Sequence, residues 1–249
     1  GSSDLPRGFD AYVGHQNVMH SLKIAVKTAV NRGEPVDHVL FHGPPGLGKT
    51  TLAHIIAREM GVRLEHTSGP ALERPADMVG LLSNLEAGAV LFIDEIHRFS
   101  KSQQDVILPH VESGAITLIG ATTENPSFEI IGPLLSRSRV FKLKPLSKIN
   151  MESILYRAIK DKDHGIGNFD VEINEDAMNA LISLSGGDAR IALNSIELAL
   201  ASADANESGL HIISREIIQD VMQKSIPSYD KKGDQHYDLI SALDRKSVV

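Results

Sequence analysis

The first 145 residues alternate between two patterns of hydrophobic positions, one with helical spacing and one made of short continuous apolar runs. Residues 17–33 carry apolar side chains at helical spacing and stop at Gly33, which predicts an amphipathic helix. Residues 38–42 form a short apolar run typical of a buried strand, and residues 49–60 again follow the helical spacing. The chain is therefore predicted to begin with a helix, a strand and a second helix.

The same alternation continues to residue 144. We expect further strands at residues 62–68, 89–94, 115–123 and 138–144, and further helices at residues 76–85 and 101–114. Strands that alternate with helices imply a parallel sheet with helices on both faces, which is an α/β fold. Because ligands of such sheets bind beyond the carboxyl ends of the strands, we expect the chemistry of this chain to lie there.

After residue 147 the pattern changes to helices alone. Four amphipathic segments predict a small helical bundle, at residues 148–161, 174–187, 188–203 and 214–224. We place a domain boundary near residue 145, with a first domain at residues 1–145 and a helical domain at residues 146–225. Residues 226–249 begin another helix and are expected to be the start of a truncated C-terminal region.

Composition narrows the class of protein. A hydrophobic fraction of 42% is sufficient for a packed core, and the absence of cysteine excludes disulfides and thiolate metal sites. The chain has no run of about 18 apolar residues and no signal-peptide pattern at its start, so we expect a soluble intracellular protein. The net charge of −7 argues against a broad nucleic-acid-binding face, but not against local contacts with DNA.

One turn carries a pattern that is typical of phosphate binding. Residues 43–50 read GPPGLGKT, which fits G-x-x-x-x-G-K-[ST], and they lie between the predicted strand at 38–42 and the body of the helix at 49–60. Glycines let backbone amides turn toward phosphate at a helix N-terminus, where the helix dipole favours an anion. Lys49 would bridge the β- and γ-phosphates, and the Thr50 hydroxyl would bind magnesium. The alternative is a simple tight turn with a solvated lysine.

A pair of acidic residues supplies what a phosphate-binding loop alone lacks. Asp94 ends the apolar run at residues 89–94, and Glu95 follows it directly. Asp94 can hold the magnesium shell, and Glu95 can polarise an attacking water as a general base. The alternative is an acid pair on a solvated edge of the sheet.

Three later positions would complete a nucleotide-dependent switch. Thr122 or Thr123 ends a predicted strand and could meet the γ-phosphate or the attacking water. Arg137 could reach the nucleotide of a neighbouring subunit, and Arg190 could touch the γ-phosphate from the start of a bundle helix. Taken singly, such residues are more often surface residues, so the interpretation depends on their order along the chain.

That order resembles the AAA+ ATPases, in the clade that holds clamp loaders, RuvB motors and RarA proteins. The resemblance implies a P-loop AAA+ fold, in which a doubly wound parallel sheet is followed by a C-terminal α-helical lid. Two positions depart from the family pattern. Many relatives have asparagine at the position called sensor 1, which is Thr123 here, and residues 136–138 read SRS where clamp loaders have SRC. By resemblance, the catalytic positions are Lys49 of Walker A, Glu95 of Walker B, Thr123 as sensor 1, Arg137 as the arginine finger and Arg190 as sensor 2.

The same resemblance implies which residues contact the ligands. Magnesium would be held by Thr50 and Asp94. ATP or ADP would be bound by the Walker A loop and by a segment near the adenine, namely Tyr12, Val13, Gly43, Pro44, Pro45, Gly46, Leu47, Gly48, Lys49, Thr50 and Thr51.

The resemblance divides along the chain. Residues 9–98 resemble RuvB, the Holliday-junction branch-migration ATPase, and residues 99–249 resemble RarA, also called MgsA, a family of replication-associated recombination ATPases. VLFIDEIHR, at residues 90–98, suits both families, so a chimera joined near this point is one hypothesis. Residues 99–118 leave no room for the β-hairpin by which RuvB contacts RuvA, and we expect no counterpart before Val249 of the winged helix of RuvB or of the C-terminal oligomerisation region of RarA.

These comparisons lead to a ranked set of functions. The first is an ATP-hydrolysing, magnesium-dependent module of DNA repair, recombination and replication-fork rescue, RarA-like, that remodels DNA as a homo-oligomer in the bacterial cytoplasm, associated with the nucleoid. Its expected partners are branched or fork DNA and either a single-strand-binding protein or RuvA, with no membrane. The alternatives are a RuvB-type branch-migration motor, a nucleotide-binding fragment with little turnover and, as the weakest, a small-molecule kinase.

Overall fold

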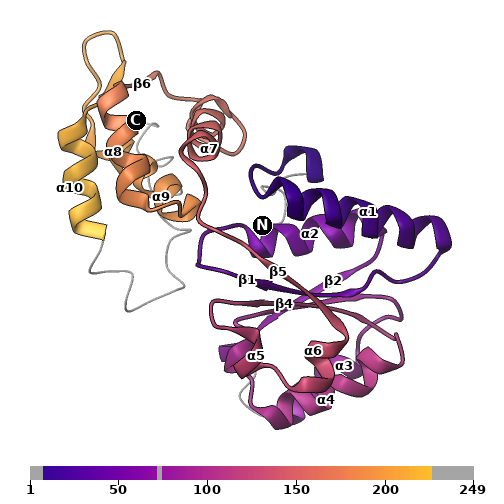
Figure 1. Ribbon diagram of the computed structural model, residues 1–249. Coiled ribbons are helices and arrows are strands. Elements are labelled where there is room, and N and C mark those ends of the chain that lie inside the picture. Colours follow the sequence, from indigo (N-terminus) through magenta and orange to yellow (C-terminus); the bar gives the residue numbers. More distant parts are fainter. Residues whose placement is uncertain (1–7, 72–74, 226–249) are drawn as a thin grey trace.

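The computed structural model describes residues 8–71 and 75–225 (Figure 1). The expected C-terminal region at residues 226–249 lies outside these residues. The strands are β1 (His38–His42), β2 (Leu64–Ser68), β3 (Val90–Asp94), β4 (Thr117–Thr122), β5 (Ser138–Lys142), β6 (Val171–Ile173) and β7 (His211–Ile213). The α-helices are α1 (Gln16–Arg32), α2 (Lys49–Met60), α3 (Pro75–Ser83), α4 (Lys101–Glu112), α5 (Pro126–Glu129), α6 (Gly132–Ser136), α7 (Lys148–Lys160), α8 (Glu175–Ser185), α9 (Ala189–Ser202) and α10 (Arg215–Ser225). The 3-10 turns within these residues are η2 (Phe9–Ala11), η3 (Gly69–Ala71) and η4 (Ile96–Arg98).

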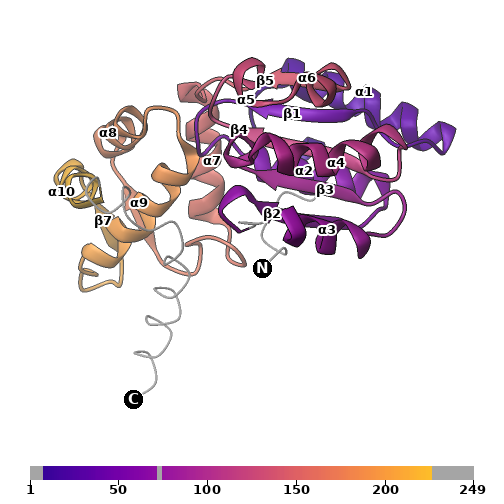
Figure 2. The ribbon, with the colours of Figure 1, turned by 90° about the horizontal axis from the view of Figure 1, so that it is seen from below.

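A five-stranded sheet forms the centre of the first part of the chain. Its strands lie in the order β2-β3-β4-β1-β5 and all pair in parallel; Figure 2 shows this order from β5 at the top to β2 at the bottom. Strand β1 lies inside the sheet between β4 and β5, with Val39 opposite Ile119 of β4 and Arg139 of β5. The predicted parallel α/β sheet is therefore confirmed.

Helices cover both faces of this sheet (Figure 1). Successive side chains of a strand point to opposite faces. In β1, Val39 and Phe41 belong to the core shared with α1 and α2, whereas Leu40 belongs to the core shared with α3, α4 and α6. Burial on both faces explains why β1, β3 and β4 read in the sequence as continuous apolar runs.

The second part of the chain lies beyond one end of the sheet and is built from α7 to α10 (Figure 1). The expectation of helices alone after residue 147 was wrong, because β6 and β7 pair in parallel, with Val171 opposite His211 and Ile173 opposite Ile213. Strands of three residues are too short to show an alternating pattern, and their pairing joins segments separated by α8 and α9. Across the residues described, no helix is both long and apolar enough to span a bilayer.

A buried glutamine joins the start of α4 to the connection between α5 and α6. The Gln104 side chain is fully buried, and its Nε2 donates to the carbonyl oxygens of Phe99 (3.1 Å) and Glu129 (2.9 Å). Its Oε1 accepts a hydrogen bond of 2.9 Å from the backbone N–H of Ile131. One side chain therefore satisfies three backbone groups in a region that water does not reach.

Replacing Gln104 by leucine should lower the free energy of unfolding by about 2–4 kcal/mol, because it leaves these backbone groups buried without partners. Chemical denaturation followed by circular dichroism measures this change. As a control, Thr28→Leu on the exposed side of α1 should change the same quantity by less than about 0.5 kcal/mol. Equal effects of the two variants would contradict the assigned role of Gln104.

Candidate functional site

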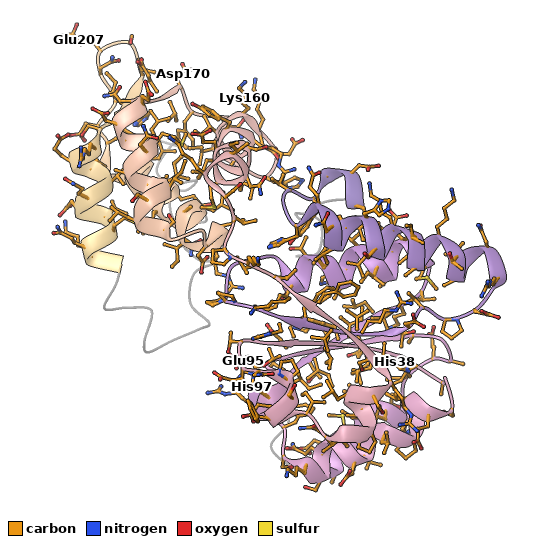
Figure 3. All side chains as sticks on the ribbon, viewed as in Figure 1. His38, Glu95, His97, Lys160, Asp170 and Glu207 are labelled. Atoms are coloured by element: carbon orange, nitrogen blue, oxygen red, sulfur yellow. The ribbon has the colours of Figure 1, made fainter. Side chains whose placement is uncertain are left out.

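A pocket of about 490 Å³ lies where the carboxyl ends of the sheet strands meet the helical bundle. The sheet side of the pocket is lined by Tyr12, Val13, residues 45–51, Asp94, Glu95, Thr122 and Thr123. The bundle side is lined by Leu146, Ile154, Arg157, Ala189, Arg190, Leu193 and Asn194. Figure 3 shows Glu95 and His97 at the end of the sheet that faces the bundle, and His38 at the opposite end. The pocket thus occupies the position at which ligands of parallel sheets bind.

The loop between β1 and α2 curves around the pocket through a backbone that only glycine adopts easily. Gly46 and Gly48 have φ angles of 70° and 76°, in the left-handed region. A side chain on Gly48 would begin 3.0 Å from the Tyr12 ring, so the loop and this ring are in close contact. The Tyr12 hydroxyl donates a hydrogen bond of 2.6 Å to the Leu47 carbonyl, and burial raises the pKa of Tyr12 above its ordinary value.

Lys49 begins α2 and is buried against the loop, with only 9% of its surface exposed. Its Nζ donates to the carbonyl oxygens of Gly43 (2.7 Å) and Pro44 (2.6 Å). Burial lowers the pKa of Lys49, while the nearby Asp94 carboxylate acts to raise it. Gly43 and Pro44, predicted to contact nucleotide, do not line the pocket; their carbonyls hold Lys49 in place.

The acid pair lies at the end of β3, beside the loop. Asp94 accepts a hydrogen bond of 3.0 Å from the backbone N–H of Glu95. Glu95 has a φ angle of 51°, which is uncommon for a residue with a side chain and costs about 1–3 kcal/mol. Its carboxylate pairs with Arg98 at 3.1 Å on the exposed side of η4. Both acids line the pocket, so the structure brings them together with Lys49.

The two threonines at the end of β4 differ in their surroundings. Thr122 is buried, and its hydroxyl lies 3.0 Å from His97 Nδ1 and accepts a hydrogen bond of 3.0 Å from the Glu124 N–H. Thr123 has an exposed side chain, and both threonines line the pocket. The Thr122 hydroxyl is therefore engaged within the protein, and Thr123 is the better placed of the two to meet a ligand.

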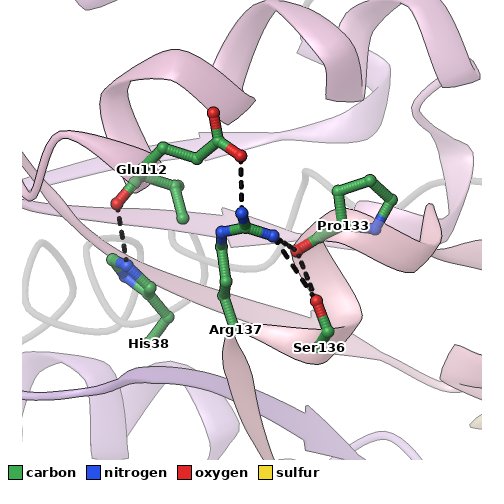
Figure 4. A network of polar contacts seen from close by, with 6 residues as sticks. His38, Glu112, Pro133, Ser136 and Arg137 are labelled. Atoms are coloured by element: carbon green, nitrogen blue, oxygen red, sulfur yellow. Dashed lines mark hydrogen bonds and ion pairs between the residues drawn. The ribbon is translucent and has the colours of Figure 1, made fainter.

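The two candidate arginines lie in different places. Arg190, in the first turn of α9, has an exposed side chain and lines the pocket. Arg137 lies just before β5, near the amino ends of the strands and outside the pocket. As Figure 4 shows, its guanidinium pairs with Glu112 at 2.7 Å and donates to the Pro133 carbonyl at 2.9 Å. Arg137 therefore cannot contact the pocket of its own subunit.

A histidine next to Arg137 is held in its neutral form. His38 Nδ1 accepts a hydrogen bond of 3.0 Å from the Leu118 N–H, so the ring hydrogen lies on Nε2, which faces the Val111 carbonyl at 3.3 Å. Burial lowers the pKa of His38; the Val111 carbonyl and Asp37 act to raise it, and Arg137 acts to lower it. Protonation would break the bond from Leu118, because a doubly protonated ring has no acceptor.

The donors available for a metal ion are hard oxygen atoms. The Thr50 hydroxyl and the Asp94 carboxylate both line the pocket, and these are ligand types that magnesium prefers. Among residues 8–71 and 75–225, no group of three or more His, Cys, Asp or Glu side chains is placed to hold a metal. Magnesium typically takes one or two protein ligands together with substrate phosphates, and this pair fits that pattern.

Sequence reasoning missed the side of the pocket that α7 and the later part of α9 provide. Arg157 lines the pocket and donates a hydrogen bond of 2.6 Å to the Ala11 carbonyl, which ties α7 to the segment before Tyr12. Leu193 and Asn194 extend the same side. An amphipathic helix pattern does not distinguish residues that face a pocket from residues that face solvent, so no signal in the sequence identified them.

Family models match both parts of the chain. Residues 5–133 match the Holliday junction DNA helicase RuvB P-loop domain, and residues 167–248 match an AAA C-terminal domain. Replication-associated recombination protein A of Escherichia coli K12 is 43% identical over 249 residues, covering 98% of this chain and 55% of that protein. The Bacillus subtilis protein of the same name is 34% identical, covering 98% of this chain and 57% of its own length. The chain thus spans about half the length of these relatives.

RuvB proteins are similar as well. The Holliday junction branch migration complex subunit RuvB of Myxococcus xanthus is 37% identical, covering 88% of this chain and 73% of that protein. The solved structure of the Thermotoga maritima RuvB Holliday junction branch migration motor superposes with a TM-score of 0.73 at 36% identity, covering 88% of this chain and 72% of that one. The match to the Escherichia coli protein extends over both the RuvB-like residues 9–98 and the RarA-like residues 99–249. A chimera joined near residues 90–98 is therefore not needed to explain the two resemblances.

The neutral state of His38 predicts how stability depends on pH. Because its pKa is lowered from 6.5 on folding, the unfolded chain takes up the proton first as the pH falls. The contribution of His38 is thus fully present above pH 6.5 and is lost below it. In urea denaturation at pH 7.5 and pH 5, conditions chosen to lie on either side of about 6.5, His38→Gln should lose less unfolding free energy than the wild type. The same loss in both proteins would contradict this assignment.

Proposed function

Because the chain belongs to the RarA/RuvB clade of AAA+ ATPases, we propose that it binds and hydrolyses ATP and couples this reaction to the remodelling of DNA. The observation that carries the proposal is the pocket itself, which gathers Lys49, Glu95 and Arg190 from three separate elements. Relatives named for replication-associated recombination support a RarA-like role. A cytoplasmic location, close to the nucleoid DNA, follows from that role.

The buried ammonium of Lys49 is suited to exchange its partners when nucleotide binds. In this structure its ammonium donates two hydrogen bonds, to the Gly43 and Pro44 carbonyls. A phosphate oxygen is a stronger acceptor for an ammonium than a neutral carbonyl, since both groups are then charged. The amides of the glycine loop and the N-terminus of α2 favour the same anion. These residues bind the β- and γ-phosphates in our proposal.

Glu95 is the proposed general base. Its carboxylate lies at the pocket but is paired with Arg98, so its orientation toward an attacking water requires this exposed pair to loosen. An exposed pair is worth about 0.2–1 kcal/mol, which is a small barrier to that movement. Thr123 would orient the water or the γ-phosphate from the end of β4.

Magnesium, when bound, would neutralise charge on the transferred phosphate, with the Thr50 hydroxyl and the Asp94 carboxylate as its protein ligands. Two arginines would stabilise the charge that develops on the leaving group and on the γ-phosphate. Arg190 would act from the lid of the same subunit. Arg137 would act only on a neighbouring subunit, because it lies outside the pocket of its own chain.

Action in trans implies an oligomer, and the lid at residues 146–225 would transmit the loss of phosphate as a rotation. Branched or fork DNA is the proposed substrate of this movement, and a single-strand-binding protein is a proposed partner.

A RuvB-type branch-migration motor is the weaker alternative, favoured by the RuvB family model over residues 5–133. Stimulation of turnover by RuvA would distinguish the motor. Tight binding with negligible turnover would indicate a nucleotide-binding module.

Nucleotide binding should depend strongly on Lys49. We expect Lys49→Ala to weaken the affinity for a fluorescent ADP derivative by about 30- to 100-fold, the equivalent of losing one charged hydrogen-bond partner. Fluorescence anisotropy measures the dissociation constants. Lys27→Ala, on the exposed side of α1, should leave the affinity unchanged. If Lys49→Ala bound as tightly as the wild type, phosphate binding by this loop would be excluded.

Turnover should require two subunits. We expect ATP hydrolysis per subunit to rise with protein concentration, and Glu95→Gln and Arg137→Ala each to reduce it by roughly 100-fold or more. An equimolar mixture of these two variants should regain part of the activity, because a subunit with an intact Glu95 then meets a neighbour with an intact Arg137.

Arg139→Ala is the matched control for this experiment, because Arg139 is also exposed and pairs with Asp37 at 2.8 Å. It should retain turnover. A mixture of Glu95→Gln and Arg137→Ala that stays inactive, although both variants bind ADP and assemble normally, would exclude a finger acting in trans.

A further inference from the structure

The turn between α8 and α9 is wedged between the glycine loop and the segment that joins the sheet to the bundle. The Ala189 N–H donates a hydrogen bond of 3.2 Å to the Gly46 carbonyl. On the other side, the Gly187 carbonyl accepts one of 3.1 Å from the Leu146 N–H. The first turn of α9 is therefore attached directly to the loop, and not only through the chain that leads into the bundle.

Asp188 fills the remaining space in this contact. A side chain built on Gly46 would have its first carbon 1.7 Å from Asp188 Oδ1, so the carboxylate occupies the volume that any other residue at position 46 would need. Asp188 is buried, with 8% of its surface exposed. The same Oδ1 accepts a hydrogen bond of 3.0 Å from the Ile191 N–H and caps α9. One carboxylate thus caps the start of α9 and packs against Gly46 of the glycine loop.

Arg190 follows two residues later, in the first turn of α9. Its exposed side chain lines the pocket from the first turn of α9, and in the described residues no hydrogen bond or ion pair holds its guanidinium. Asp188 does not line the pocket. Both residues act on the pKa of Lys49, Arg190 to lower it and Asp188 to raise it, so they lie within electrostatic range of the phosphate site.

We propose that Asp188 is the positioning residue for Arg190: by seating the first turn of α9 on the backbone of Gly46, it makes the placement of the arginine follow the conformation of the phosphate-binding loop. This inference rests on the proposed binding of ATP in the pocket. The first turn of α9 then follows any change in the conformation of the glycine loop through a direct contact. A lid that has lost this contact still covers the bound nucleotide, but Arg190 is no longer held at the γ-phosphate.

The test compares affinities and does not depend on hydrolysis. Dissociation constants are measured for ADP and for a non-hydrolysable ATP analogue, which differ by the γ-phosphate that Arg190 would contact. Arg190→Ala should reduce the preference for the analogue by about 10-fold. Asp188→Ala should reduce it by a similar factor and change the ADP affinity by less than about twofold. Asp188→Asn keeps the cap and the shape, since asparagine caps helices as well as aspartate, and should retain most of the preference.

The double variant Asp188→Ala/Arg190→Ala separates positioning from a general loss of structure. If Asp188 acts through Arg190, the double variant should be no worse than Arg190→Ala alone. Ser214→Ala is the matched control, because the Ser214 hydroxyl accepts from the Ile217 N–H at the start of α10, away from the pocket. It removes a comparable cap and should leave the preference unchanged.

Several results would overturn the proposal: additive losses in the double variant, a wild-type preference in Asp188→Ala, or an equal loss in Ser214→Ala. A preference that is insensitive to Arg190→Ala would overturn it as well. The failure of the proposed ATPase function is a separate result. If the protein shows no turnover but the Asp188 and Arg190 variants still lose their preference for the ATP analogue non-additively, the positioning role stands and only the proposed hydrolysis fails.

Discussion

A nearly buried ammonium group sets the main constraint on this structure. Lys49 is 9% exposed, and two carbonyl oxygens of its own loop satisfy two of its three donor hydrogens. A buried charge is stable only with compensation, and the Asp94 carboxylate at the end of β3 provides part of it. The curved glycine loop, the acid pair and the lid arginine all lie around this group. Their common position at one end of a parallel sheet follows from the need to bring opposite charges and backbone dipoles to a single point.

The helical bundle is connected to Lys49 and its loop by backbone contacts as well as by side chains. Ala189 and Gly46 share a hydrogen bond, and Arg157 holds the Ala11 carbonyl on the other side of the pocket. The pocket is therefore closed by elements that each touch the sheet domain independently. A movement of the loop and a movement of the segment before α1 would reach the lid at two different helices, α9 and α7.

Local sequence patterns predicted most of the fold because the signals are themselves local. The predicted helix at residues 49–60 has the observed bounds of α2, since its spacing and the flanking glycines are read within a few residues. The pair β6 and β7 was missed, because a three-residue strand is stabilised by a partner beyond two helices and not by its own pattern. For the site, strand ends predicted Lys49 and Asp94 on one edge. The strand pattern could not decide whether Thr122 or Thr123 faces a ligand, because that depends on the contact between His97 and the Thr122 hydroxyl.

The position of β1 between β4 and β5 has a consequence for how the protein is made. A ribosome completes His42 long before its two neighbouring strands, of which the second ends at Lys142. At about 5–20 residues per second, this delay is roughly 5–20 s. During that time the nascent phosphate loop follows a strand without partners, whereas the edge pair β2 and β3 can already form. The proposed nucleotide site is thus encoded early and assembled late, because β1 is paired on both sides only after β4 and β5 have been synthesised.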